Sequence, residues 1–178
     1  MNKIKILPDE IINQIAAGEV LDRPSSAVKE LVENSIDANS KKISVFVRDG
    51  GKTEIIVTDD GDGISKQELE LAVTRHATSK LNEKKIDTLS FLGFRGEALP
   101  SIGSVSEMSI KSNINEDQNG MMIEIIAGIK KKIRPVNHRK GTTVSVKKLF
   151  FSTPARLKFL KTDNYESLLI KRIIQKLA

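Results

Sequence analysis

The spacing of apolar residues changes from a helical repeat to a strand repeat within residues 24–58. Apolar side chains recur every three or four positions in the first part, which predicts a helix over residues 24–38. Residues 43–48 then alternate between the two faces of a strand, and Asp49-Gly50-Gly51 supplies a turn. A second apolar run over residues 54–58 completes a hairpin. A helix followed directly by a hairpin favours a mixed α/β sandwich over a strict βαβ alternation.

The rest of the chain continues this mixture of helices and strands. Ser65 and Glu68 have the spacing of a capping box, with Ile64 and Leu69 as its hydrophobic staple, so we expect a helix from there to about His76. The other expected elements are a first helix over residues 9–18, a long loop over 77–96, a helix from Glu97, strands near 105–112, 121–126 and 143–146, and a helix over 164–178. The last helix has Leu168, Leu169, Ile173 and Leu177 spaced for one apolar face.

Composition limits the function classes. The chain has 178 residues, 39% of them hydrophobic, which suits one globular domain. It has no cysteine, which excludes disulfides and thiolate chemistry, and only two histidines, which disfavours a multi-histidine metal site. No apolar run approaches the roughly 20 residues that span a bilayer, so we expect no membrane contact and a cytoplasmic location.

The net charge of +6 is compatible with nucleic-acid binding. The basic excess falls late, at Lys130, Lys131, Lys132, Arg134, Arg139, Lys140, Lys147 and Lys148. On charge alone, an ordinary solvated surface is the favoured explanation of these residues. One tyrosine and no tryptophan argue against a base-stacking platform for single strands.

Gly51-Lys52-Thr53 resembles the end of a phosphate-binding P-loop, but two features exclude that motif. The first glycine of a P-loop should stand five positions earlier, where this chain has Phe46. A strand pattern follows instead of a helix. We interpret the segment as a hairpin turn.

Glu30 and Asn34 lie four residues apart and therefore project from one face of the predicted second helix, with Asp37 one turn on. This polar stripe is either the solvent side of an amphipathic helix or a site. In the second case Asn34 would offer an oxygen to Mg²⁺ and Glu30 would orient and deprotonate a water.

Asp59-Asp60-Gly61-Asp62-Gly63 follows directly on a predicted strand. Its glycines allow the backbone to approach a ligand closely, and a carboxylate can accept a hydrogen bond from an exocyclic amine such as that of adenine. A tight turn is an equal alternative. A calcium loop is a weaker one, because the distal glutamate of an EF-hand is missing.

The segment from Gly93 to Leu99 leads into a predicted helix, and free N–H groups at such a point form a natural anion cradle. A plain loop with a packed Phe94 is the alternative. Gly141-Thr142-Thr143 opens a strand whose hydroxyls would either touch a base or pair locally. We expect structural or surface roles for His76 and His138.

Taken in order, these motifs resemble the four nucleotide-binding motifs of the GHKL ATPases. Within that superfamily the chain resembles the MutL family of DNA mismatch-repair proteins from about Lys5 to its last residues. The strings that carry this resemblance are residues 14–20, 29–35, 75–80, 93–99 and 153–160. The resemblance implies an α/β (α+β) two-layer sandwich, with a mixed sheet covered by helices on one face.

It also implies an ATP and Mg²⁺ site. By the resemblance, Glu30 is the general base, Asn34 binds Mg²⁺, Asp59 recognises adenine beside Gly63, and Thr143 lies near the base. The lid over the nucleotide would contain Thr78, Ser79 and Lys80. The phosphates would meet Gly93, Phe94, Arg95, Gly96 and Glu97. The family more often has asparagine at Asp60, and we expect the added charge to weaken nucleotide binding modestly.

Residues 1–178 would then form the N-terminal ATPase domain of a protein that continues into a second domain, which supplies a lysine to the γ-phosphate, and a C-terminal dimerisation domain. Without these, we expect ATP binding with slow or no hydrolysis, and a mobile loop over residues 77–96 when no nucleotide is bound. The implied partners are a MutS-type mismatch recognition protein, a downstream endonuclease or helicase, DNA bound weakly, and a second copy when ATP is bound. The alternatives are another GHKL ATPase, or a DNA-binding or scaffolding module with an inactive ATP pocket.

Overall fold

The computed structural model describes residue 8 and residues 17–18, 21–74, 96–116 and 118–178. Its centre is a seven-stranded sheet with strand order β1-β2-β7-β3-β4-β5, and β6 pairs with β4 beside β5. The elements are α2 (Pro24–Asp37), β1 (Ile43–Arg48), a 3₁₀ turn (Asp49–Gly51), β2 (Glu54–Asp59), α3 (Lys66–Ala72), α4 (Ala98–Ser104), β3 (Glu107–Asn113), β4 (Gly120–Ile126), β5 (Ile129–Lys130), β6 (Arg134–Val136), β7 (Gly141–Lys147), α5 (Pro154–Phe159) and α6 (Asp163–Leu177).

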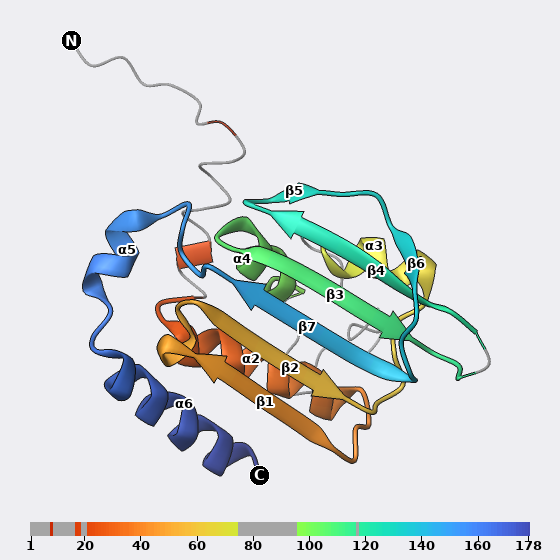
Figure 1. Cartoon of the computed structure of the whole chain (residues 1–178), viewed down its shortest axis with the longest axis horizontal. Helices are drawn as coiled ribbons and strands as arrows, with labels where there is room; N and C mark the ends of the chain where they lie inside the picture. Colours follow the sequence, from red (N-terminus) through yellow and green to blue (C-terminus); the bar gives the residue numbers. More distant parts are fainter. Residues whose placement is uncertain (1–7, 9–16, 19–20, 75–95, 117) are drawn as a thin grey trace, which may run out of the picture.

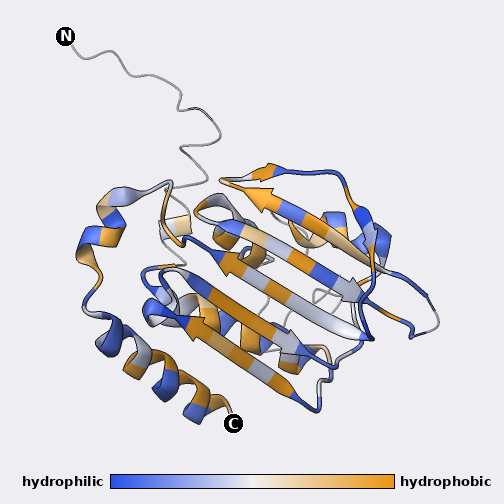
Figure 2. Cartoon of the chain, viewed as in Figure 1, coloured by the Kyte–Doolittle hydropathy of each residue, from blue (hydrophilic) through white to orange (hydrophobic). Residues whose placement is uncertain are grey.

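Helices cover one face of this sheet and leave the other open. Figure 1 shows α2, α3 and α4 behind the strands, while α6 packs against α2 and the 3₁₀ turn. The core lies between the two layers, where Val28 and Leu31 of α2 meet Ile55 and Val57 of β2. Complete burial of one such side chain stabilises the fold by about 1.5–3 kcal/mol. Apolar and polar residues alternate along β7 in Figure 2, as a sheet with one covered face requires.

Several expectations are confirmed. The second helix and the hairpin form as predicted, and the Gly51-Lys52-Thr53 segment belongs to the turn between β1 and β2. The capping box is present, since the Ser65 hydroxyl accepts from the Glu68 N–H and the Glu68 carboxylate accepts from the Ser65 N–H. The two-layer sandwich with helices on one face is also confirmed.

Other expectations are wrong. All the strand pairings in the described part of the chain are antiparallel, so the sheet is not mixed. The helix after the capping box ends at Ala72, before His76, because Thr74 N–H bonds back three residues to Leu71. On α6, Leu168 is 44% exposed, whereas Glu166 and Ile170 face the core.

Three short elements are absent from the sequence prediction: β5, β6 and α5. The strands have only two and three residues, and Pro135 within β6 cannot donate to a ladder. The expected loop over residues 77–96 and nearly all of the expected first helix lie outside the described residues. Within the described ranges, the helices are too short and too polar to span a bilayer.

Candidate functional site

The carboxylate of Asp59 joins three separate segments at the end of β2. Asp59 is only 8% exposed. Its Oδ2 accepts a 2.8 Å hydrogen bond from the Ser35 hydroxyl on α2. Its Oδ1 accepts from the N–H of Gly61 at 3.0 Å and from that of Thr142 on β7 at 3.1 Å. The helix layer, the loop after β2 and the sheet therefore meet at this one side chain.

The loop after β2 is held against its neighbours, and its shape requires glycine. Gly63 has a φ of +75°, and a Cβ on it would lie 2.1 Å from the carbonyl oxygen of Asn113. The Asp62 N–H donates to the Ala38 carbonyl at 2.9 Å, which fastens the loop to the end of α2. Asn39 adds a 2.7 Å side-chain bond to Asp62. The segment is thus a clamped loop beside a buried carboxylate, which goes beyond a simple surface turn.

Gly141 makes the corresponding close approach from the other side. Its φ is +111°, and a Cβ there would lie 2.1 Å from the carbonyl oxygen of Asp59. This contact brings the Thr142 N–H within reach of the Asp59 carboxylate. The glycine before the two threonines is therefore explained by close packing against β2.

Glu30 and Asn34 lie one turn apart on α2, as predicted. Both are partly buried, with the Glu30 side chain 27% exposed and its Oε1 3.7 Å from Nζ of Lys29. Asn34 immediately precedes Ser35, which bonds Asp59. The polar stripe of α2 therefore lies next to the buried carboxylate of Asp59, and its side chains are only partly exposed to solvent.

Only part of the predicted phosphate cradle can be located. Gly96 has a φ of +62°, and Glu97 directly precedes α4 as its N-cap. Thr78, Ser79, Lys80, Gly93, Phe94 and Arg95 lie outside the described residues. The start of α4 follows the predicted cradle, as the sequence indicated.

The structure separates Thr143 from Asp59. The Thr143 hydroxyl lies on the open face of the sheet, 3.2 Å from the Thr58 hydroxyl and 2.9 Å from Nε2 of His138. Because side chains alternate along a strand, Thr142 faces the helix layer on the same side as Asp59. The threonine beside the Asp59 carboxylate is therefore Thr142.

The carboxylate of Asp60 is directed away from that of Asp59. Its Oδ1 accepts from the N–H groups of Lys41 and Lys42 at 2.8 and 2.9 Å, so the carboxylate points toward the segment before β1. These bonds, led by that from Lys42, lower the pKa of Asp60 below its ordinary value. The additional charge is thus directed away from the Asp59 carboxylate.

Ser35 and Ser112 belong to this network with Thr142, and neither serine was predicted as a site residue. The Ser112 hydroxyl bonds the Thr142 hydroxyl at 2.8 Å and accepts from the Ile64 N–H at 2.8 Å. A signal for Ser35 was present, since it is a polar residue in line with Val28 and Val32 on the apolar stripe of α2. A hydroxyl on a buried stripe indicates a specific partner.

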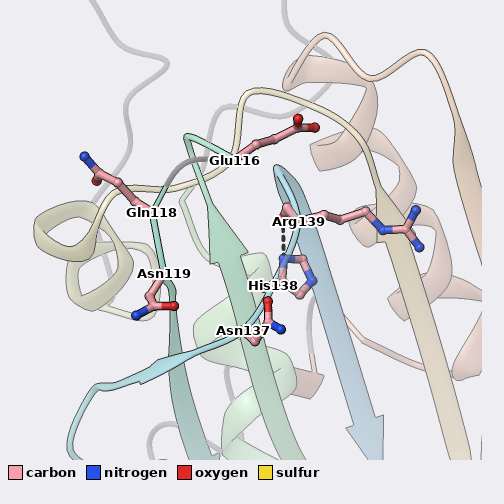
Figure 3. A pocket seen from close by; sticks show the side chains of 6 residues that line it. All are labelled: Glu116, Gln118, Asn119, Asn137, His138 and Arg139. Carbon is pink, nitrogen blue, oxygen red and sulfur yellow. Dashed lines mark hydrogen bonds between the residues drawn. The ribbon is translucent and has the colours of Figure 1, made fainter.

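A cavity lies next to this network and not within it. It has a volume of about 440 Å³ and opens between the β3–β4 and β6–β7 connections. The residues in Figure 3 line it: Glu116, Gln118, Asn119, Asn137, His138 and Arg139. His138 links the cavity to Thr143 on the open face of the sheet.

Comparisons with known proteins agree with this architecture. A family model described as "Histidine kinase-, DNA gyrase B-, and HSP90-like ATPase" matches residues 22–148. An Aquifex aeolicus MutL ATPase domain complexed with ADP has a TM-score of 0.71 and 35% identity, covering 87% of this chain and 54% of that one. The N-terminal domain of a DNA repair protein has a TM-score of 0.77 and 32% identity, covering 92% and 47%.

The antiparallel sheet, the helix layer and the carboxylate at the end of β2 are those of a GHKL-type ATPase domain, and the chain belongs to the family of histidine kinase-, DNA gyrase B- and HSP90-like ATPases. MutL proteins of Afipia carboxidovorans and Rickettsia bellii are each 49% identical to it over 175 residues, 98% of the chain. Within the family it is therefore a MutL-type ATPase domain. It spans 29% of the length of these two relatives.

Proposed function

We propose that this chain binds ATP with Mg²⁺ and hydrolyses it, and that the carboxylate of Asp59 recognises the adenine. The observation that carries the proposal is the hydrogen-bond arrangement at Asp59. An ionised carboxylate has about four acceptor positions, and three are occupied by Ser35, Gly61 and Thr142. The position left on Oδ2 suits one N–H of an exocyclic amine. The ADP complex of the similar Aquifex aeolicus domain supports a nucleotide as the ligand.

The residues present fit a magnesium ion held mainly by phosphates. Mg²⁺ prefers six oxygen ligands, keeps several waters and commonly takes only one or two protein side chains beside a nucleotide. Asn34 offers one such oxygen, one residue from the Ser35 contact to Asp59. In the described part of the chain no three histidine, cysteine or acidic residues form a metal cluster, which agrees with a site of one side chain. The bound ion would neutralise charge on the phosphates.

Glu30 is the proposed general base. It lies one turn before Asn34, so its carboxylate can accept a hydrogen bond from a water beside the phosphates and then take its proton. This water attacks the γ-phosphate in line with the bond that breaks, and such an attack requires positioning more than covalent chemistry. We place Thr78, Ser79 and Lys80 in the lid, Gly93 to Glu97 at the phosphates and Gly63 in the adenine loop. These roles rest on the resemblance of their motifs.

We extend the proposal to the role of the whole protein. Residues 1–178 correspond to the N-terminal ATPase domain, which in the cytoplasm would couple mismatch recognition by a MutS-type protein to nicking and strand removal. ATP-driven pairing of two copies and weak DNA binding belong to the same proposal. The similarity to MutL proteins supports it.

Titration calorimetry with Mg²⁺-ATP tests the nucleotide site. We expect the unmodified chain to bind, and Asp59→Ala and Asn34→Ala to lose most of that binding. Asp60→Ala is the matched control, because it removes a neighbouring carboxylate that points toward Lys41 and Lys42. Glu30→Gln should bind ATP and fail to turn it over. If the unmodified chain does not bind Mg²⁺-ATP, the proposal fails and a DNA-binding module with an inactive pocket replaces it.

A further inference from the structure

Lys29 on α2 lies between two carboxylates of its own helix. Its Nζ is 3.1 Å from Oε2 of Glu33 and 3.1 Å from Oε1 of the same carboxylate. The same Nζ is 3.7 Å from Oε1 of Glu30, the proposed general base. Among the described residues, these contacts are the only ion pairs of Glu30 and Glu33. One ammonium group thus links the side chain of the base to a second carboxylate.

The Glu33 end of this arrangement is buried and the Glu30 end is more open. The Glu33 side chain is 8% exposed, whereas the side chains of Glu30 and Lys29 are 27% and 44% exposed. A buried carboxylate is costly without a partner of opposite charge, so the ammonium group is held most firmly at Glu33. Glu33 therefore anchors the lysine, and the longer contact to Glu30 is made from this anchored position.

The charges around Lys29 agree with this division of strength. Burial acts to lower the pKa of Lys29, but the hydrogen bond and the charge of Glu33, followed by the charge of Glu30, raise the pKa above its ordinary value of 10.5. Lys29 is therefore positively charged at neutral pH. An ammonium group has three donors, so it can serve both carboxylates at once.

Helix stability alone gives little reason for a lysine at this position. Lys29 stands four residues before Glu33, and this order is the less favourable one for a pair on a helix, because glutamate preceding lysine interacts better. Ion pairs that are partly open to solvent also contribute little to folding. The effect of Lys29 on the orientation of Glu30 explains the arrangement better.

The contact engages one oxygen of Glu30 and leaves the other available. Oε2 of Glu30 makes no ion pair or hydrogen bond with a described residue. A glutamate side chain has several rotatable bonds, and holding one oxygen removes much of that freedom. A general base must lie within hydrogen-bond reach of its water, and a displacement of about 1 Å can lower the rate on the order of 100-fold. A fixed Glu30 carboxylate is therefore important for the rate.

We propose that Lys29, anchored by Glu33, is a positioning residue that holds Glu30 with its free oxygen available to the attacking water. This inference rests on the proposed function, because it requires Glu30 to be the base for ATP hydrolysis. Lys29 contacts the base and not the nucleotide. It therefore acts on the chemical step and leaves the affinity for Mg²⁺-ATP unchanged.

NMR titration of the nucleotide-free chain with isotope-labelled lysine tests the arrangement itself. The Lys29 signal is assigned by its loss in Lys29→Met, and we expect it to titrate above 10.5. Glu33→Gln should lower this pKa, and Glu30→Gln should lower it by a smaller amount, because Glu33 has the shorter contacts. An unchanged Lys29 pKa in both variants would overturn the arrangement.

Single-turnover hydrolysis of Mg²⁺-ATP tests the role of Lys29 in the reaction. Lys29→Met should lower the rate of the chemical step about tenfold, and should change the dissociation constant for Mg²⁺-ATP by less than about twofold in calorimetry. Lys29→Arg should retain the rate to within about threefold, since a guanidinium also bonds carboxylates. The matched control is Lys171→Met, which removes the same charge from an exposed position on α6 and should leave both quantities unchanged.

A complex that imitates the transition state gives a second measurement that does not require turnover. Tetrafluoroaluminate bound with Mg²⁺-ADP imitates the phosphoryl group under attack by water. Lys29→Met should weaken this complex about tenfold and leave the binding of Mg²⁺-ADP alone unchanged. The double variant of Lys29→Met with Glu30→Gln should bind the complex no more weakly than Glu30→Gln alone, because Lys29 acts through Glu30.

The outcomes separate this inference from the proposed function. If Lys29→Met matches the unmodified chain in hydrolysis and in the tetrafluoroaluminate complex, the inference is overturned and the proposed function stands. Weaker binding of Mg²⁺-ATP itself by Lys29→Met would place the ammonium group at the phosphates and would also overturn it. A chain that binds Mg²⁺-ATP without measurable turnover is judged by the tetrafluoroaluminate complex. An unmodified chain that does not bind Mg²⁺-ATP would contradict the proposed function and this inference together.

Discussion

Ser35 on α2 donates a 2.8 Å hydrogen bond to Oδ2 of Asp59 at the end of β2, and both side chains are at least nine-tenths buried. This bond joins the helix that carries Glu30 and Asn34 to the carboxylate proposed to recognise adenine. Together with the packing of Val28 and Leu31 in the core, it holds one face of α2 against the end of β2. The two halves of the proposed site are therefore linked directly through this hydroxyl.

Replacing Ser35 by alanine should lower both stability and nucleotide affinity. Loss of a buried donor to a carboxylate costs about 1–3 kcal/mol of unfolding free energy, which urea denaturation measures. ATP affinity should fall as well, because Asp59 is no longer held. Ser44→Ala, which removes an exposed hydroxyl from β1, is the control and should leave stability within about 0.5 kcal/mol. A Ser35→Ala chain as stable as the unmodified one would contradict this role.

Gly63→Ala should be considerably more harmful than Gly128→Ala. Both positions have positive φ, at +75° and +87°, so both incur left-handed strain of about 1–2 kcal/mol. Only Gly63 also places a Cβ 2.1 Å from a backbone oxygen, whereas the nearest atom at Gly128 is 3.8 Å away. We expect Gly63→Ala to exceed its control by at least about 1 kcal/mol in chemical denaturation. Equal losses would mean that the loop after β2 yields to the added methyl group.

Asp60 should contribute acid sensitivity and little to nucleotide binding. Its pKa is lowered from 3.8, so its stabilising contribution is present above that pH and is lost as pH falls through the folded-state value. Asp60→Asn should flatten the decline of the unfolding midpoint below about pH 4. ATP affinity should change by less than about twofold, because the carboxylate points toward Lys41 and Lys42. A larger change in affinity would place Asp60 in the adenine site after all.

His138 should titrate below 6.5 in the folded chain. Its pKa is lowered by burial and then by Lys111 and Arg139, so the unfolded chain holds more protons as pH falls below 6.5. Unfolding free energy should therefore decrease over that range and level off below the folded pKa. NMR titration of the ring, assigned by comparison with His138→Gln, measures the shift. A pKa at or above 6.5 would contradict the arrangement of Lys111 and Arg139 around the ring.

Local patterns were sufficient where neighbouring residues determine the structure. The helix from Pro24, the hairpin through Gly50 and Gly51, and the Ser65–Glu68 capping box depend on residues within a few positions of each other. The stripe on α2 likewise placed Glu30 and Asn34 on one face. Interactions of this range can be predicted from spacing and residue type alone.

Partners far apart in the chain could not be predicted in the same way. Which of Thr142 and Thr143 faces Asp59 depends on the register of β7 against β2, and a shift of one residue exchanges the two faces. On α6 a charged residue, Glu166, is buried with its Oε1 accepting from the Lys161 N–H, and Leu168 is turned outward. Hydrophobicity alone predicts the opposite, with Leu168 buried and Glu166 exposed.

The place of β7 in the sheet has a consequence for how the chain folds during synthesis. Among the described strands of this sheet β7 comes last in the chain, yet it lies between β2 and β3 and hydrogen-bonds to both. The β1–β2 and β3–β4 hairpins can form early, but each leaves one unpaired edge until Lys147 has left the ribosome. The Thr142 bond to Asp59 spans 83 residues and arises only at that moment. Nascent chains halted before β7 should consequently be prone to aggregation and unable to bind nucleotide, so ligand binding would report completion of the sheet.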